Sequence, residues 1–192
     1  MQNMKERKIT EVKYFACGYC TNKLKYIIKK PDVKVKEFYA GVFLINHSKY
    51  GYILFDTGYS EQIYKCGLVG KLYNLFNPVY INKNEKITEQ LRKEDINCNS
   101  IKNVILSHLH PDHIGCVKEF YNSKFIVSQD CMKEYKRSNI KSLVLKKMLP
   151  YDFESRTIII EKFNKEYEVF KGFDLFEDGS IILTQIDGHF KG

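Results

Sequence analysis

Residues 107–113 read SHLHPDH, so three of the five histidines in the chain and one aspartate fall within seven positions. Neutral imidazole and carboxylate groups are ligands that zinc and other borderline first-row metals take in proteins. Donors this close in sequence bind a cation far more readily than they pack in an apolar core. The stretch therefore predicts a metal site made by His108, His110, Asp112 and His113.

The segment before this cluster is expected to be a short buried strand, because residues 101–106 (IKNVIL) are mainly apolar and are bounded by polar residues. In an extended chain, side chains two positions apart point to the same side, so the imidazoles of His108 and His110 would reach one ion. Pro111 favours this arrangement, because a residue before proline is disfavoured in the helical conformation. The strand would thus deliver two histidines together at its carboxyl end.

A turn and a helix are expected directly after the two histidines. The proline ring suits a turn or a first helical position, and residues 114–120 (IGCVKEF) look like the start of a helix. Gly115 would let the backbone pass close to the cluster, because it carries no side chain. Asp112 and His113 lie at the turn itself, so one loop would supply ligands to two metal subsites.

The rest of the chain alternates between predicted strands and helices. Residues 42–45 and 52–55 are apolar strands joined by a polar turn, in which His47 is expected to face solvent. Residues 124–128 indicate a further strand, and residues 130–137 a helix. Because such alternation is typical of layered proteins, the sequence predicts an α/β fold.

Length and composition indicate a single domain over residues 1–192, because no proline- or glycine-rich linker, repeat or low-complexity tract divides the chain. Hydrophobic residues make up 44% and aromatic residues 14% of the sequence, which is enough for a sizeable core. The first residues are polar and lack the apolar stretch of a secretory signal, and no apolar run has the length of a membrane span. We expect a cytoplasmic protein with no membrane partner.

The formal net charge is +8, but lysine and arginine are scattered along the chain and form no basic block. A solvated surface explains this pattern better than a nucleic-acid interface does, although a basic surface would also steer an anionic substrate. We therefore expect a small-molecule substrate and no nucleic-acid partner.

The six cysteines show no framework of disulfides, so we expect reduced thiols. Cys17 and Cys20 have the spacing of a metal-binding pair, but a lone pair lacks the second pair that a structural zinc site needs. Cys116 follows His113 by three positions. We expect it to be a small buried residue on the predicted helix and not a ligand.

Three motifs together resemble one known family. Residues 108–113 have its His-x-His-x-Asp-His signature, residues 52–58 (YILFDTG) match its earlier strand ending in Asp-Thr-Gly, and residues 185–189 (QIDGH) are similar to its later Gly-His element. The family is that of the metallo-β-lactamase-fold hydrolases, which include lactonases, glyoxalase II-type thioesterases, β-lactamases and phosphodiesterases. The opening of the chain is most similar to the lactonase branch. The resemblance implies an α/β fold of the four-layer αββα sandwich type.

The resemblance also implies which residues would bind metal. A first ion would be held by His108, His110 and His189, and a second ion by Asp112 and His113. Asp56 would lie beneath the site and orient the ligand loop, because hydrogen bonds of this kind fix the direction and tautomer of a coordinating imidazole. The implied cofactor is a pair of Zn²⁺ ions, with iron or manganese as alternatives.

The sequence departs from the family pattern at its C-terminus. Family members continue past the Gly-His element to a metal-bridging aspartate and a final histidine, whereas this sequence ends at Gly192. We therefore expect a truncated chain in which the C-terminal part of the second half of the sandwich is missing, the first ion binds weakly and the second poorly. Sheet edges exposed in this way aggregate unless they are covered, and a homodimer is one way to cover them.

The activity implied by the resemblance is zinc-dependent hydrolysis. Two metal ions would lower the pKa of a bound water, and the resulting hydroxide would attack an ester, lactone, thioester or phosphodiester. Asp112 would hold a metal and shuttle the proton. Two alternatives stay open: a mononuclear-iron oxygenase of the same fold, and a catalytically inactive remnant that binds metal or a partner.

Overall fold

The computed structural model describes residues 7–23, 35–137 and 143–186 of the chain. The large sheet consists of β1 (Ile9–Lys23), β2 (Val35–His47), β3 (Gly51–Phe55), β4 (Val79–Tyr80), β5 (Asn103–Ile105), β6 (Lys124–Ser128) and β7 (Thr157–Ile160). A smaller sheet consists of β8 (Lys165–Tyr167), β9 (Phe170–Asp174) and β10 (Ile182–Leu183). The α-helices in the described part are α1 (Gly67–Phe76), α2 (Ile87–Lys93), α3 (Pro111–Ile114) and α4 (Gln129–Arg137).

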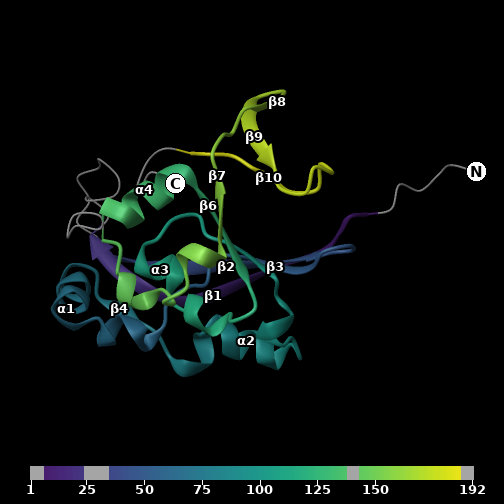
Figure 1. Cartoon of the computed structure of the whole chain (residues 1–192). Helices are drawn as coiled ribbons and strands as arrows, with labels where there is room; N and C mark the ends of the chain where they lie inside the picture. Colours follow the sequence, from purple (N-terminus) through teal and green to yellow (C-terminus); the bar gives the residue numbers. More distant parts are fainter. Residues whose placement is uncertain (1–6, 24–34, 138–142, 187–192) are drawn as a thin grey trace, which may run out of the picture.

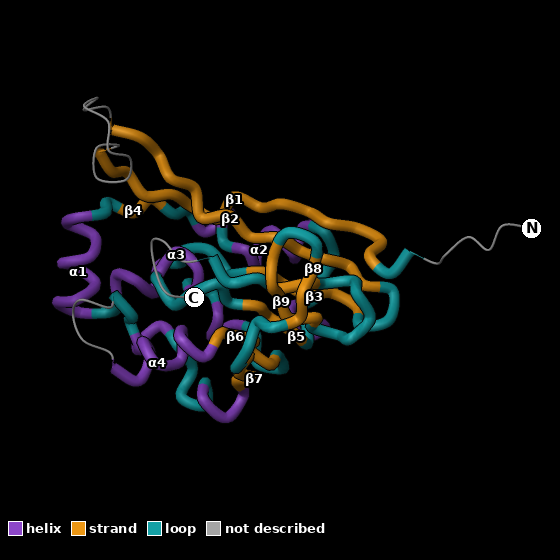
Figure 2. The backbone as a smooth tube through the Cα atoms, turned by 90° about the horizontal axis from the view of Figure 1, so that it is seen from above, coloured by secondary structure: helices purple, strands orange, loops and turns teal. Residues whose placement is uncertain are grey.

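The elements are arranged in layers (Figure 1). The helices pack on one face of the large sheet around one hydrophobic cluster, and a second cluster lies on its other face, where the small sheet contributes Phe173 and Leu183. Seen from above, β8 and β9 lie over β3 and β5 (Figure 2). A large sheet with helices on one face and a smaller sheet on the other confirms the predicted α/β fold.

The large sheet changes from antiparallel to parallel along its width, in the order β4-β1-β2-β3-β5-β6-β7. Strands β1 to β4 form antiparallel pairs, whereas β3, β5, β6 and β7 run parallel. Phe55, Ile105 and Ile126 are neighbours in this parallel part. The carboxyl ends of β3, β5 and β6 therefore meet at one edge, which is where parallel sheets commonly bind ligands.

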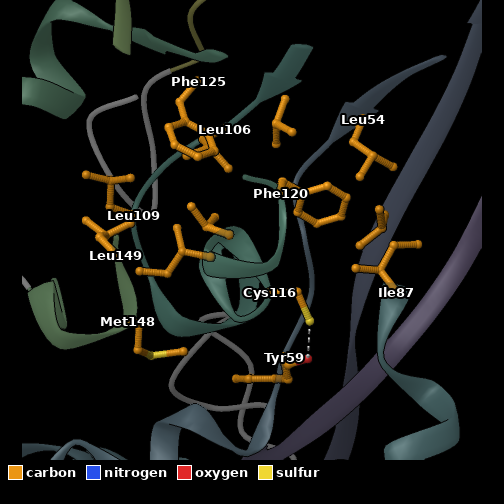
Figure 3. Close-up of a cluster of buried hydrophobic side chains, with 14 of the residues drawn as sticks. Leu54, Tyr59, Ile87, Leu106, Leu109, Cys116, Phe120, Phe125, Met148 and Leu149 are labelled. Atoms are coloured by element: carbon orange, nitrogen blue, oxygen red, sulfur yellow. Dashed lines mark hydrogen bonds between the residues drawn. The ribbon is translucent and has the colours of Figure 1, made fainter. Parts of the chain in front are cut away.

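The helix-side core contains the predicted buried strand before the histidine cluster, although β5 begins two residues later than expected. Figure 3 shows Leu54 of β3, Leu106 directly after β5, Ile87 of α2 and Phe120 as members of one cluster. Each of these four side chains is almost fully buried. Removing such apolar surface from water is the main stabilising contribution of this layer, at about 25 cal/mol per Å².

All six cysteines are free thiols. Burial raises the pKa of the Cys17 thiol to about 12, so this residue is unreactive near neutral pH. No helix in the described ranges combines the length and apolar character that a membrane span requires.

The prediction that His47 faces solvent is wrong, because the loop between β9 and β10 covers it. It is the last residue of β2 and is only 1% exposed. Its Nε2 lies 3.0 Å from the hydroxyl of Ser180, and its Nδ1 accepts a hydrogen bond of 3.0 Å from the backbone N–H of Lys49. The rings of Tyr50 and Phe176 pack against the imidazole, with centroids 4.8 and 5.3 Å away. His47 thus joins the β2–β3 turn to the loop before β10.

Replacing His47 with alanine should lower the free energy of unfolding by about 2–3 kcal/mol, because a buried ring and two hydrogen bonds are lost together. Urea unfolding of the two proteins measures the difference. Lys36→Ala, an exposed change on the same strand, is the control and should stay within about 0.5 kcal/mol of the parent. Equal unfolding midpoints for His47→Ala and the control would contradict the role assigned to this side chain.

Candidate metal centre

The candidate site begins where β3 and β5 end side by side. Asp56 directly follows β3, and its backbone N–H donates a hydrogen bond of 2.8 Å to the carbonyl of Ile105, the last residue of β5. Asp56 has a left-handed backbone with φ 64°, a conformation that aspartate tolerates better than most residues. The parallel register thus brings the Asp-Thr-Gly segment next to the histidine loop, although about fifty residues separate them in the sequence.

Asp56 holds both ends of the histidine loop through its carboxylate, which is 2% exposed. Its Oδ1 accepts a hydrogen bond of 2.8 Å from the backbone N–H of Ser107. Its Oδ2 accepts one of 2.8 Å from the Ser107 hydroxyl and lies 2.7 Å from Nδ1 of His113. A carboxylate with three such contacts fixes the position of the loop and the orientation of the His113 ring.

Residues 57–60 also fix the backbone of the loop. The N–H and hydroxyl of Thr57 both donate to the carbonyl of His113, at 2.8 and 2.9 Å. The N–H of Gly115 donates to the carbonyl of Gly58 at 2.8 Å, and the N–H of Cys116 donates to the Thr57 hydroxyl at 3.2 Å. Every turn of this loop is therefore tied to the segment after β3.

These contacts explain why the predicted helix over residues 114–120 is wrong. The α3 helix ends at Ile114, and a separate 3₁₀ turn covers Val117–Glu119. The backbone N–H groups of Gly115 and Cys116 bond to the 57–60 segment and so do not continue an α-helix. Cys116 is buried as expected, but it lies between the two turns, with its Sγ 3.8 Å from the carbonyl oxygen of Tyr59 (Figure 3).

The loop brings three predicted ligands into one cluster. One potential donor atom each from His108, Asp112 and His113 lies within 4.8 Å of the others. The ring of His110 is 4.6 Å from that of His108, centroid to centroid, but His110 does not belong to this three-donor set. His189 lies outside the described residues.

The cluster fits a divalent metal ion. Ligand atoms about 2.0–2.2 Å from one zinc ion are at most about 4.4 Å apart, so only small side-chain movements would bring these three donors to one ion. Two imidazoles and a carboxylate are also the donor types that such an ion prefers. The donor set therefore agrees with the chemistry expected from the sequence.

The charges of the cluster depend on one another. Burial by itself lowers the pKa of His113, but the charge of Asp56 and hydrogen bonds to Asp112 and Asp56 outweigh it and hold the pKa well above its usual value. Burial by itself raises the pKa of Asp112, but the hydrogen bond with His113 and the nearby histidines hold that pKa well below its usual value. His113 Nε2 lies 3.1 Å from Asp112 Oδ2, so without metal the two form an ion pair.

Metal binding should release a proton from His113, because a coordinating nitrogen must be deprotonated. Because the pKa of His113 is raised, apparent zinc affinity should rise about tenfold per pH unit above pH 7. If His113 had the ordinary histidine pKa of about 6.5, the affinity would no longer change in this range. The metal-free protein should show the opposite trend: the stability that protonated His113 contributes is complete below about pH 6.5 and is lost as pH rises through its folded-state pKa.

Zinc titrations against a competing chelator at several pH values measure the affinity trend, and calorimetry in buffers of different ionisation enthalpy measures the released proton. An affinity that is constant above pH 7 would contradict a protonated His113 in the metal-free protein.

Two side chains contribute to this centre although no role was predicted for them from the sequence. The Ser107 hydroxyl contacts Asp56 and also lies 3.1 Å from Nδ1 of both His108 and His113. Thr57 bonds to the loop backbone on the other side. The only indication of these roles in the sequence is that Ser107 precedes the predicted ligand His108 and that Thr57 follows Asp56. By contrast, Cys17 and Cys20 belong to no metal-binding group among the described residues.

Comparison with known proteins identifies the family that the three sequence motifs resemble. The family model described as the metallo-beta-lactamase superfamily matches residues 37–190. The N-acyl homoserine lactonase AiiB of Rhizobium rhizogenes is 37% identical over 79 residues, which are 41% of this chain and 29% of that protein. The N-acyl homoserine lactonase AttM of Azorhizobium caulinodans is 26% identical over 153 residues, which are 78% of this chain and 56% of that protein. The chain thus covers less than two thirds of the length of each of these two relatives.

A solved structure has the same fold. It is an N-acyl homoserine lactone hydrolase with the product N-hexanoyl-L-homoserine bound at its catalytic metal centre. The TM-score is 0.74 and the identity 21%, over 96% of this chain and 68% of that chain. At this identity the likeness establishes a shared architecture, while substrate contacts depend on individual side chains.

Proposed function

Because the chain belongs to the metallo-beta-lactamase superfamily, we propose that it is a zinc-dependent hydrolase that opens lactones or related esters. The observation that carries this proposal is the cluster of His108, Asp112 and His113 donors within 4.8 Å of one another. The names of the relatives favour a lactone, since AiiB and AttM are both N-acyl homoserine lactonases.

Within this proposal, each residue of the centre has a separate task. His108 and His110, with His189, would hold a first ion, and Asp112 and His113 would hold a second, so the clustered donors of His108, Asp112 and His113 would be shared between two ions. A bound zinc ion supplies a Lewis acid and lowers the pKa of coordinated water to about 7. Asp56 keeps Nδ1 of His113 engaged at 2.7 Å, which leaves Nε2 as the nitrogen that would coordinate an ion. The Asp112 side chain is 28% exposed, so a substrate or solvent can reach the carboxylate that would shuttle the proton.

A cavity beside His108 supports a substrate with an apolar part. Its volume is about 470 Å³, within the range of about 300–1,000 Å³ typical of small-molecule sites. Most of its lining is apolar and comes from both sheets, including Ile105, Ile126 and Leu183. The polar residues that line it are Ser107, His108, Ser128 and Thr184. We propose that an acyl chain enters this cavity while the lactone or ester group stays at the metal centre.

Elemental analysis of the purified full chain tests the metal assignment. Zinc should be present in the parent protein and absent from the His108→Ala, His110→Ala double variant. Asp95→Asn, which changes an exposed aspartate that also has a left-handed backbone, should retain the zinc. Iron in place of zinc would contradict the zinc hydrolase and favour an oxygenase, and a folded parent without any metal would contradict a metalloenzyme.

A substrate series tests the proposed chemistry. Hydrolysis of N-acyl homoserine lactones and simple esters should become more efficient as the acyl chain lengthens, because each additional buried CH₂ contributes about 0.8 kcal/mol. The double variant should lose this activity. Cleavage of phosphodiesters alone, or rates independent of chain length, would contradict the assignment of substrate class and cavity.

A further inference from the structure

The α1 helix turns its apolar side toward solvent. Leu68, Leu75 and Phe76 are 82%, 72% and 68% exposed, and Val69 and Leu72 are also exposed, whereas the buried residues of α1 are Gly70 and Tyr73. At about 100° per residue, the five exposed apolar side chains form one stripe about 120° wide. A stripe of this width is normally buried against another element.

The contacts beneath α1 hold it in this orientation. A Cβ at Gly70 would lie 2.3 Å from the carbonyl oxygen of Ile63, so the helix sits directly on the preceding turn. The Tyr73 hydroxyl lies 3.1 Å from that of buried Tyr59, and the Asn74 side chain accepts a hydrogen bond of 2.9 Å from the N–H of Val79. Rotating the stripe inward would break all of these contacts, so α1 presents it as a fixed surface.

Tyrosines extend this apolar stripe toward the edge of the large sheet. Tyr64 precedes α1 and donates a hydrogen bond of 3.0 Å to the carbonyl of Val79, beside Tyr80 of edge strand β4. Tyr80 stacks on Tyr19, with ring centroids 5.0 Å apart. Tyrosine is enriched in protein interfaces, because its ring packs while its hydroxyl finds a polar partner.

We propose that this surface binds a second copy of the chain, with α1 packed antiparallel on α1 of the partner. We define the α1 surface by these residues: Tyr64, Leu68, Val69, Leu72, Leu75, Phe76 and Tyr80. Each is at least 40% exposed. A standard specific interface buries about 800 Å² on each partner, so neighbouring side chains would join these seven in the contact.

The α1 surface is complementary to itself. Leu68, Leu72 and Leu75 follow the alternating spacing of four and three residues with which one helix packs along another. The first turn of α1 has no acidic residue and its last turn no basic residue. Antiparallel packing would therefore place Lys65 of one copy, just before α1, near the partially negative carboxyl end of the other α1. Lys71 borders the stripe, where its long side chain keeps the ammonium group in water.

Analytical ultracentrifugation of the full chain over a range of concentrations tests the proposal. The parent should approach twice the chain mass of 22.7 kDa as concentration rises, while a Leu68→Glu, Leu75→Glu double variant should remain at 22.7 kDa. Both side chains are mostly exposed, so the variant should keep the circular dichroism spectrum of the parent. Val169→Glu, at a similarly exposed apolar site in the turn between β8 and β9, should still dimerise.

Two outcomes would overturn the proposal. One is a parent protein that stays monomeric at every concentration. If this monomer binds vesicles of phosphatidylglycerol and phosphatidylcholine through the same leucines, the α1 surface binds lipid and not a second copy. The other is a double variant that dimerises as strongly as the parent. Neither result depends on hydrolase activity, so the interface can fail while the proposed function stands.

Discussion

Replacing Asp56 with asparagine is expected to weaken zinc binding by about 10–100-fold, the usual effect of removing a carboxylate that orients a metal ligand. Asparagine keeps the size of the side chain and tolerates the left-handed backbone, with φ 64°. It can still accept the hydrogen bond from the Ser107 N–H at Oδ1. It places an amide NH₂ where Oδ2 now faces the Ser107 hydroxyl and His113 Nδ1. The expected loss of zinc affinity should therefore measure how much the orientation of the His113 ring contributes to binding.

Asp56→Ala should have a larger effect, because it also leaves the Ser107 N–H without its acceptor. We expect the free energy of unfolding of the metal-free protein to fall by about 3 kcal/mol or more, as happens when one partner of a buried charged pair is removed. Chelator competition measures affinity, and urea unfolding measures stability. Asp95→Asn is the matched control, since Asp95 has a similar backbone with φ 56° at an exposed position. Zinc affinity within twofold of the parent in Asp56→Asn would refute the orienting role.

Gly115→Ala is expected to destabilise the protein by about 3 kcal/mol or more, a severe case of overpacking. The added Cβ would lie 2.3 Å from the carbonyl oxygen of Gly58 and 2.5 Å from the backbone nitrogen of Ser60. Both are backbone atoms, so no side chain can rotate to relieve the contact. The backbone of Gly115 has φ −54° and ψ −39°, which alanine adopts readily. The destabilisation should therefore arise because the added methyl group forces the histidine loop away from residues 58–60.

The same substitution should also weaken zinc binding, because it separates the histidine loop from the segment that holds it. Gly41→Ala is a suitable control: its Cβ would meet the ring of Tyr14 at 2.8 Å, and that exposed side chain can move. We expect the control to change unfolding by less than about 1 kcal/mol. If Gly115→Ala and Gly41→Ala lowered the thermal unfolding temperature equally, the close packing at Gly115 would not be the cause of the destabilisation.

The candidate metal-binding loop and the type of fold could both be recognised from the sequence alone. Ligand chemistry is carried by residue type, and the spacing of His108, His110, Asp112 and His113 is short enough that local geometry keeps them together. The apolar runs that became β2, β3, β5 and β6 were recognisable for a similar reason, since a buried strand leaves a local mark in composition. Burial of β5 and β6 on both faces is what made their runs almost continuous.

How that loop is held, and which surfaces remain exposed, depends on contacts between segments that are distant in the sequence. Gly115 ends the α3 helix because a segment about fifty-five residues earlier occupies its backbone hydrogen bonds, and no periodicity near Gly115 records that segment. His47 lies in a polar turn by sequence, yet residues more than a hundred positions later bury it. The stripe on α1 is likewise an ordinary amphipathic pattern, and only the packing of Gly70 and Tyr73 directs it outward. Local patterns specify elements and ligand types, whereas burial and orientation depend on contacts between segments far apart in the chain.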